Sequence, residues 1–151
     1  MIRFLVLLVI TSNVYAGEYD TPEQAIKTLE LAYSEGSIEK ALEARDFEAE
    51  AKLMLLNINP ELASDKGILK QAEDVLLLGT KQEFESGLPN FSGLKCSLKN
   101  KTKIEHGVIQ FDEVCIFPDQ GSSEQSVYAF NGSKGWRYVA YLPKKPLQEH
   151  Q

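Results

Sequence analysis

The chain has 151 residues, of which 22 are acidic and 16 are basic, so its formal net charge is −6 at pH 7. An acidic surface of this size argues against nucleic acid and anionic lipid as partners, because both are polyanions. It is compatible with a basic protein partner, although acidity alone mostly serves solubility. The length suits one compact domain with one hydrophobic core.

The N-terminal residues have the pattern of a cleavable secretory signal. Arg3 precedes the apolar run 4–10, and Val14 and Ala16 place small residues where a signal peptidase cleaves. A membrane anchor would need about 20 apolar residues, and polar residues end this run at roughly half that length. We therefore expect a signal peptide over residues 1–16, a single domain over residues 17–151 without a membrane span after processing, and a periplasmic or secreted location.

The first helix after the signal has clear start and stop signals. Thr21 and Gln24 form a capping box, and Pro22 suits the first helical position, where its missing N–H costs nothing. Gly36 allows the chain to leave the helix in a left-handed conformation. The spacing of the apolar residues between these signals predicts an amphipathic helix.

Three more helices are predicted before residue 80. Ser37 caps a second helix, and Asp46 offers a cap for a third over residues 47–58. A longer helix is predicted over residues 64–80, and we expect this half of the chain to supply much of the core. The apolar residues of that longer helix are Ile68, Leu69, Ala72, Val75, Leu76 and Leu78.

Beyond Gly79 the hydrophobic period changes from that of helices to that of strands. Helices followed by a strand meander predict an α+β fold, with the N-terminal helices packed on one face of an antiparallel sheet of about four strands. The predicted strands cover residues 94–103, 108–117, 125–131 and 136–142.

Cys96 and Cys115 are the only cysteines, and an exported protein meets an oxidising compartment. If residues 104–107 form the loop between the first two strands, the hairpin register places the two cysteines directly opposite each other. A redox-active pair would need the Cys-x-x-Cys spacing, which is absent. We therefore predict a structural disulfide between Cys96 and Cys115.

The same register makes further predictions for this hairpin. It pairs Leu94 with Phe117 and Thr102 with Ile109, and Glu113 interrupts an otherwise apolar face. The apolar residues of that face are Ile109, Phe111, Cys115 and Phe117.

The first predicted strand also carries three lysines at alternate positions, Lys99, Lys101 and Lys103. Alternation places them on one face of the strand. They predict a solvent-facing row that discourages pairing with other strands.

Histidine is nearly absent, with His106 in the predicted hairpin loop and His150 in the tail. Neither position suits catalysis, and no cluster of His and Cys has the spacing of metal ligands. We therefore expect no metal site and no cofactor.

Carboxylates remain as candidate acids or bases. Asp46, next to apolar Phe47, is placed where a helix cap meets the mouth of a cavity, although capping alone explains it. Glu30 and Arg45 either face inward or form surface ion pairs. Aromatic residues of the helices and strands either fill the core or line a pocket, and we expect Trp136 to pack against the helices. The candidate ligand pocket consists of Tyr33, Asp46, Phe47, Phe111, Tyr128 and Trp136.

The stretch "TPEQAIKTLELAYSEGSIEKALE" resembles the N-terminal helices of the NTF2-like (nuclear transport factor 2-like) superfamily, and "GWRYVAYL" is similar to its last strand. The resemblance implies a cone in which a curved sheet wraps helices around a pocket, and frequent dimerisation through the sheet, so a homodimer stays open. Members of this superfamily include isomerases, dehydratases, carriers, adaptor domains and toxin-immunity proteins. The fold alone therefore does not select a function.

The sequence departs from the superfamily pattern in two places. A short strand usually follows the second helix, and none is apparent here. In the ketosteroid-isomerase type, a tyrosine lies two turns before the glycine that ends the first helix and an acid lies on the following strand. Glu30 stands near the tyrosine position, so no catalytic residue can be carried over.

These observations favour a secreted or periplasmic, non-enzymatic binding protein for a small apolar ligand or a protein partner. An immunity protein that neutralises a basic toxin is a sharper version of the second alternative. The rival interpretation is a small hydrolase or isomerase that uses Asp46 with a tyrosine such as Tyr128. A purely structural role is the third.

Overall fold

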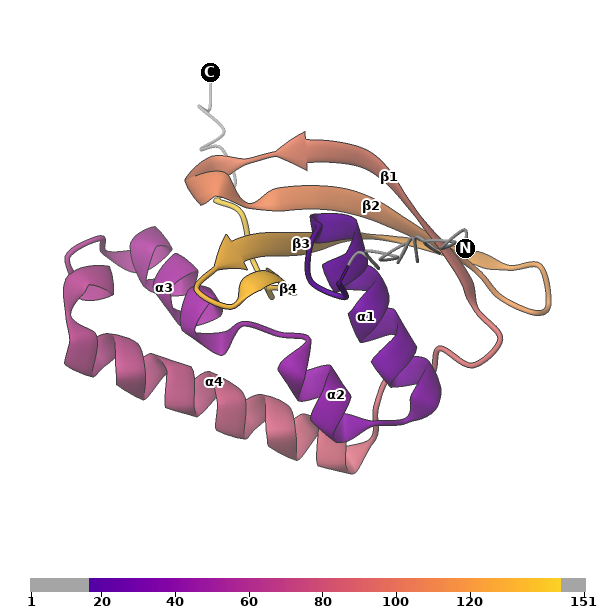
Figure 1. The fold of residues 1–151 in the computed structure, drawn as a ribbon, viewed down its shortest axis with the longest axis horizontal. Helices are drawn as coiled ribbons and strands as arrows, with labels where there is room; N and C mark the ends of the chain where they lie inside the picture. The colour runs from indigo at the N-terminus through magenta and orange to yellow at the C-terminus, as the bar shows by residue number, and fades with distance from the viewer. Residues whose placement is uncertain (1–16, 145–151) are drawn as a thin grey trace, which may run out of the picture.

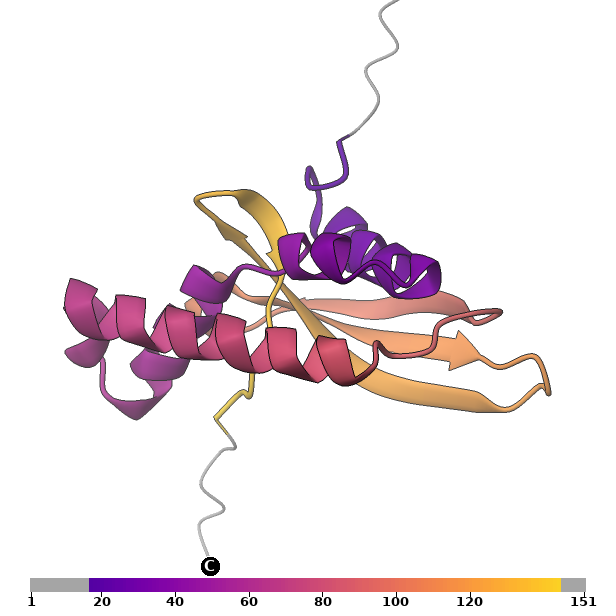
Figure 2. The ribbon, with the colours of Figure 1, turned by 90° about the horizontal axis from the view of Figure 1, so that it is seen from below.

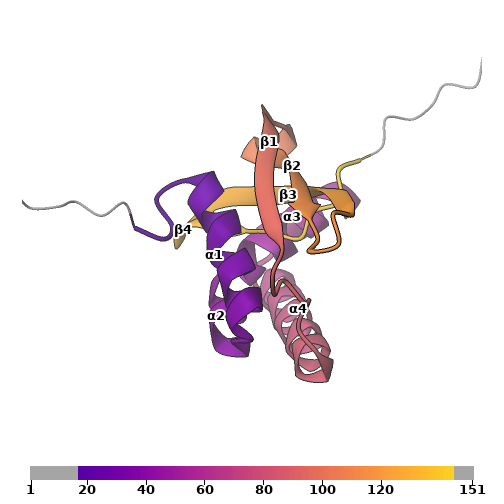
Figure 3. The same cartoon turned by 90° about the vertical axis from the view of Figure 1, so that its right-hand side faces the viewer.

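The computed structural model describes residues 17–144 (Figure 1), so the predicted signal peptide and His150 lie outside the described residues. Four helices precede a curved four-stranded antiparallel sheet, and β1 and α4 lie on opposite sides of the molecule (Figures 1 and 3). This α+β arrangement is confirmed, and it agrees with the cone that the NTF2-like resemblance implies. The helices are α1 (Pro22–Glu35), α2 (Ile38–Glu43), α3 (Phe47–Ile58) and α4 (Lys66–Ser86), and the strands are β1 (Lys95–Lys103), β2 (Ile109–Ile116), β3 (Ser122–Gly132) and β4 (Gly135–Tyr138).

Short polar side chains begin the first three helices, as predicted. Thr21, Ser37 and Asp46 each accept a hydrogen bond from a backbone N–H in the first turn of the helix that follows. Gly36 ends α1 with φ = 67°, the left-handed conformation that glycine adopts without a steric penalty. The chain therefore turns sharply between α1 and α2 and folds α2 back beside α1.

Two clusters of the core contact opposite faces of the same strands, and a third joins α1, α2 and α4 through Leu29, Ala41 and Phe84. Ile26 of α1 packs on Phe111 and Val127, whereas Leu53 of α3 belongs to a separate cluster with partly buried Tyr128. Because successive side chains of a strand point to opposite faces, Val127 and Tyr128 show that α1 and α3 cover different faces of β3. Helices therefore cover both faces of β3 toward its C-terminal end.

The fourth helix differs from the prediction in both bounds and burial. It begins after Asp65, which caps it, and ends at Ser86 rather than near residue 80. Its buried residues are Thr80 and Phe84, whereas Val75 and Leu78 are exposed. The apolar spacing marks a helix correctly, but α4, which lies nearest the viewer in Figure 2, rests on α3 and α2 and supplies little of the core.

The disulfide between Cys96 and Cys115 is confirmed, and the two residues pair directly across β1 and β2. The predicted pairing of Thr102 with Ile109 is wrong by one residue, because the register shifts between Lys99 and Thr102. Asn100 has φ = 52° at this bulge, a conformation that Asn tolerates better than most residues.

Other strand bounds also differ from the prediction. β2 ends at Ile116, which leaves Phe117 outside the strand and partly exposed. Glu113 is buried on the same face of β2 as Phe111 and Cys115. β3 begins at Ser122, three residues earlier than predicted, and β4 ends at Tyr138 rather than continuing to residue 142.

After α2, where the NTF2-like pattern has a short strand, the chain forms a single parallel bridge between Arg45 and Tyr138. The Asp46 N–H donates to the Tyr138 C=O, and the Tyr138 N–H donates to the Ala44 C=O. Residues 44–46 therefore extend the sheet beyond β4 by one short contact. Among residues 17–144, no helix is long and apolar enough to cross a bilayer.

Candidate functional site

Two cavities lie beside the middle of β3. The larger cavity has a volume of about 710 Å³ and the smaller one about 290 Å³, and Tyr138 lines both. The larger cavity is lined by Arg45, Glu50, Met54, Asn57, Ile58, Leu76, Ser126, Tyr128, Tyr138, Ala140, Tyr141 and Leu142. The smaller cavity is lined by Ile26, Leu29, Glu30, Tyr33, Pro89, Phe91, Glu113, Gln125, Val127 and Tyr138.

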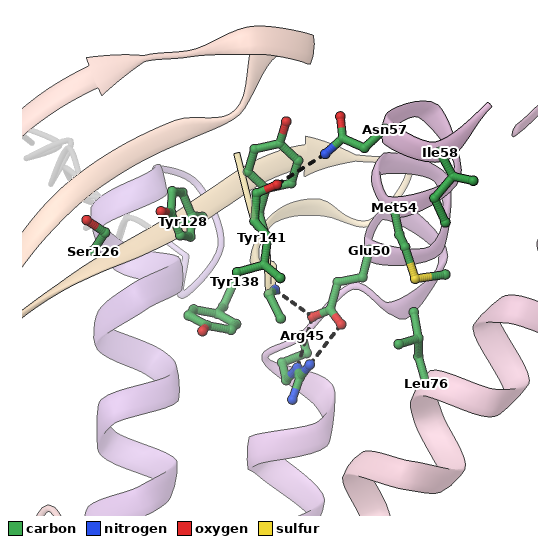
Figure 4. A pocket seen from close by; sticks show the side chains of 12 residues that line it. Arg45, Glu50, Met54, Asn57, Ile58, Leu76, Ser126, Tyr128, Tyr138 and Tyr141 are labelled. Atoms are coloured by element: carbon green, nitrogen blue, oxygen red, sulfur yellow. Dashed lines mark hydrogen bonds and ion pairs between the residues drawn. The ribbon is translucent and has the colours of Figure 1, made fainter. Parts of the chain in front are cut away.

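A buried ion pair lies at the base of the larger cavity (Figure 4). Arg45 donates two hydrogen bonds to the Glu50 carboxylate, at 2.9 and 2.8 Å. The Ala140 N–H also donates to Glu50 Oε1 at 3.0 Å. Burial raises the pKa of Glu50, while Arg45 and the Ala140 N–H oppose that shift. Because Glu50 is held by Arg45 and itself accepts from the Ala140 N–H, the ion pair positions the residues that follow β4.

The wall of the larger cavity is mainly apolar. Met54 and Ile58 project from one side of α3, and Leu76 projects from α4 toward them (Figure 4). Tyr128 and Tyr141 form the opposite wall, with their rings edge to face at a centroid distance of 5.7 Å. Pockets of this kind, apolar with a few polar groups, are the usual sites of small ligands.

One lining residue, Asn57, has a polar atom without a partner among the described residues. Asn57 Oδ1 is buried without a hydrogen bond to any described residue, while its Nδ2 donates to the Leu142 C=O at 3.2 Å. An unsatisfied buried acceptor costs free energy.

The smaller cavity lies between α1 and the sheet and contains two carboxyl groups. Glu30 comes from α1 and Glu113 from β2, and Gln125 donates a hydrogen bond to Glu113. Burial raises the pKa of Glu30 to about 7, Lys27 at 2.9 Å opposes the shift, and neighbouring Glu113 adds to it. Glu30 Oε1 is buried and has no hydrogen-bond partner among the described residues.

Aromatic rings line the rest of the smaller cavity. Tyr33 packs against Phe91 at a ring centroid distance of 5.3 Å and against Phe84 at 5.8 Å. Burial raises the pKa of Tyr33 to about 12, so its hydroxyl is protonated at neutral pH. The cavity therefore combines negative charge with aromatic walls.

The structure distributes the six predicted pocket residues between cavities and core. Tyr33 lines the smaller cavity and Tyr128 the larger one. Asp46 and Phe47 are buried at the start of α3, where Arg45 stacks 4.9 Å from the Phe47 ring centroid. Phe111 is buried under α1, and Trp136 is only half-buried beside it. These four do not line either cavity, because helix capping and sheet packing occupy their side chains.

Asp46 and Tyr128, the pair expected for a hydrolase or isomerase, are therefore not brought together at one cavity. The pocket prediction did not include Glu30, Arg45 and Glu50. The signal for Glu30 is its helical spacing from Ile26 and Tyr33, which places it on the inward face of α1. Among residues 17–144, no group of three His, Cys, Asp or Glu side chains is arranged to hold a metal ion.

No known protein-family profile matches the chain, and no curated protein matches its sequence. Among solved structures, the chain is similar to one described as an NTF2-like transpeptidase from Campylobacter jejuni. The TM-score is 0.45 and the identity is 12%, over 81% of this chain and 100% of that one. A likeness of this degree carries no argument about what the present chain does, so its function has to be inferred from its own cavities.

Proposed function

We propose that the protein is a binding protein that takes up an apolar group in the larger cavity. The observation that carries this proposal is the cavity of about 710 Å³, whose walls are mainly apolar. Binding there removes apolar surface from water.

We further propose that binding takes place outside the cytoplasm. The disulfide between Cys96 and Cys115 supports an oxidising compartment, and the apolar run near the N-terminus supports export. A basic protein partner, including a toxin, remains a second candidate that the net charge of −6 favours.

An apolar fluorescent probe tests the proposal directly. N-phenylnaphthylamine should bind the protein with enhanced fluorescence, and Met54→Trp should weaken its binding by about tenfold or more by filling the cavity. The control variant is Val75→Trp, which adds the same ring at an exposed position of α4 that does not line the cavity. Equal binding by all three proteins would refute uptake in this cavity.

A further inference from the structure

Part of β3 has an open edge. β4 pairs only with the C-terminal end of β3, from Ala129 to Gly132, and one more bond joins the Val139 N–H to the Tyr128 C=O at 3.0 Å. Beyond that point the chain leaves the sheet. Within the described part of the chain, residues 122–127 have no strand on this side, and residues 122–126 are exposed.

The backbone groups at this edge point outward. Tyr128 directs its C=O toward the β4 side, and backbone groups alternate in direction along a strand. The N–H and C=O groups of Ser126 and Glu124 therefore point to the same open side. No hydrogen bond to these groups from the described residues is present.

The edge has few of the features that usually block strand addition, since Glu124 is its one charged residue. Residues 122–127 include no proline and no lysine, and their pairing with β2 continues without a bulge. Natural proteins protect exposed edges with such features. β1, the other edge, has lysines and a bulge instead.

The two cavities lie on opposite faces of this same edge. Ser126 and Tyr128 line the larger cavity, while Gln125 and Val127 line the smaller one. A strand added beside β3 would point its successive side chains to opposite faces. Neighbouring residues of such a strand would therefore enter different cavities.

The two cavities favour different side chains. The larger one is apolar, whereas the smaller one presents the carboxyl groups of Glu30 and Glu113 beside the rings of Tyr33 and Phe91. A basic side chain would meet negative charge and aromatic faces there. Its ammonium group would also give Glu30 Oε1 the hydrogen-bond donor that it lacks.

We propose that the protein binds an extended peptide segment that adds to the sheet antiparallel to β3 at residues 122–127, with an apolar side chain in the larger cavity and a neighbouring basic side chain in the smaller one. This proposal rests on the proposed function, because the apolar side chain is the group taken up by the larger cavity. Main-chain hydrogen bonds supply affinity in strand addition, and the two cavities supply specificity.

The geometry predicts which peptide N–H groups matter. In an antiparallel pair, directly opposed residues have side chains on the same face, so the apolar residue opposite Ser126 exchanges hydrogen bonds with it. The N–H groups of the apolar residues therefore face β3, and those of the basic residues face solvent. The probe is acetyl-Thr-Leu-Lys-Leu-Lys-Thr-amide, measured by calorimetry with the full chain.

N-methylation of both leucines should weaken peptide binding by about tenfold or more, whereas N-methylation of both lysines should leave it within about twofold. Glu124→Pro, which removes one outward N–H at a position that lines neither cavity, should likewise weaken peptide binding while leaving N-phenylnaphthylamine binding intact, whereas Glu124→Gln should preserve both. The thermal midpoint and circular dichroism show whether each variant is folded, and the two N-methylated peptides need only the unmodified protein.

Each remaining outcome overturns the peptide proposal. Equal affinity for both N-methylated peptides would show that the edge of β3 is not used. If the peptide did not bind but N-phenylnaphthylamine did, only the proposed uptake of apolar groups in the larger cavity would stand. A protein that binds the peptide but does not bind N-phenylnaphthylamine would refute both the proposed function and the contact of the apolar side chain with the larger cavity. A dimer in sedimentation that Glu124→Pro dissociates would identify a second copy of the chain as the occupant of the edge.

Discussion

Asp46 and Gly132 lie so close together that there is no space for a methyl group on the glycine. Asp46 Oδ1 accepts a hydrogen bond from the Ala49 N–H at 2.9 Å, which fixes the carboxylate at the start of α3. A Cβ atom at Gly132 would overlap Asp46 Oδ2. The start of α3 and the end of β3 are therefore fitted to each other.

Gly132→Ala should lower the free energy of unfolding by about 2 kcal/mol, because the capping carboxylate has to move. The control is Gly79→Ala on α4, where nothing lies within 4 Å and alanine favours the helix. Urea unfolding measures both variants. In an Asp46→Ser background, whose shorter side chain still caps α3, Gly132→Ala should cost much less, and an unchanged cost would refute the steric cause.

Glu30 should make stability depend on pH. Its pKa is about 7 in the folded protein against an ordinary 4.5, because burial outweighs Lys27. A raised carboxyl pKa means that the folded state binds the proton more tightly, so the favourable contribution is complete below about pH 4.5 and is lost as the pH rises to about 7. Above that range the buried charge destabilises the fold.

Glu30→Gln should therefore raise the unfolding free energy at pH 8 by about 1 to 2 kcal/mol more than at pH 5. Gln carries no charge at either pH, so the variant lacks the cost of burying an ionised carboxylate. Urea midpoints at the two pH values provide the test, with exposed Glu35→Gln on the same helix as the control. The same change at both pH values would disprove the assignment.

The Arg45 and Glu50 pair should be costly to break from one side. Arg45→Leu leaves a buried carboxylate without a cation and should cost about 3 kcal/mol. Arg45→Leu combined with Glu50→Gln should cost less than Arg45→Leu alone, because the amide is neutral and still accepts the Ala140 N–H. Chemical unfolding of the single and double variants measures the difference, and a double variant as unstable as the sum of its parts would contradict it.

Removal of the disulfide should destabilise the sheet. Cys96 and Cys115 close a loop with a sequence separation of 19, for which the chain-entropy model gives about 3 kcal/mol. The double variant with both cysteines replaced by serine should lose about this much in urea unfolding. In protein purified from its native compartment, intact mass should correspond to an oxidised chain that begins near Gly17; two free thiols on an uncleaved chain would refute both the disulfide and the signal.

Local chemistry made the helix starts predictable. Thr21, Ser37 and Asp46 cap helices through contacts that span only a few residues, so the sequence contains all the information needed. The cysteine pairing was predictable for a related reason, since a short loop determines the register of the hairpin next to it.

Burial was less predictable, because it depends on which face meets another element. The apolar spacing of α4 predicts a core helix, but Val75 and Leu78 are exposed because no element covers that side among the described residues. The candidate pocket had the same difficulty. Aromatic type alone does not distinguish Phe111 in the core from Tyr128 at a cavity, since strand parity and the positions of α1 and α3 decide it.

The three lysines of β1 are exposed as predicted, but the bulge at Asn100 divides them between two faces of the strand. Lys99 lies opposite Asp112, whereas beyond the bulge Lys103 lies opposite Ile109 on the α1 side. Lys101 pairs with Glu23 of α1 at 2.8 Å and lies 5.9 Å from the Phe111 ring centroid. A left-handed Asn is not visible in the hydrophobic pattern.

Two lysines now tether α1 to β1, since Lys27 also donates to the Cys96 C=O at 2.8 Å. The smaller cavity, between α1 and the sheet, therefore has walls held at a fixed separation. The larger cavity has one wall on α4, whose buried residues lie only toward its C-terminal end. We therefore expect the larger cavity to bind apolar groups of many sizes, and the smaller cavity to be selective for the length and shape of the group that it binds.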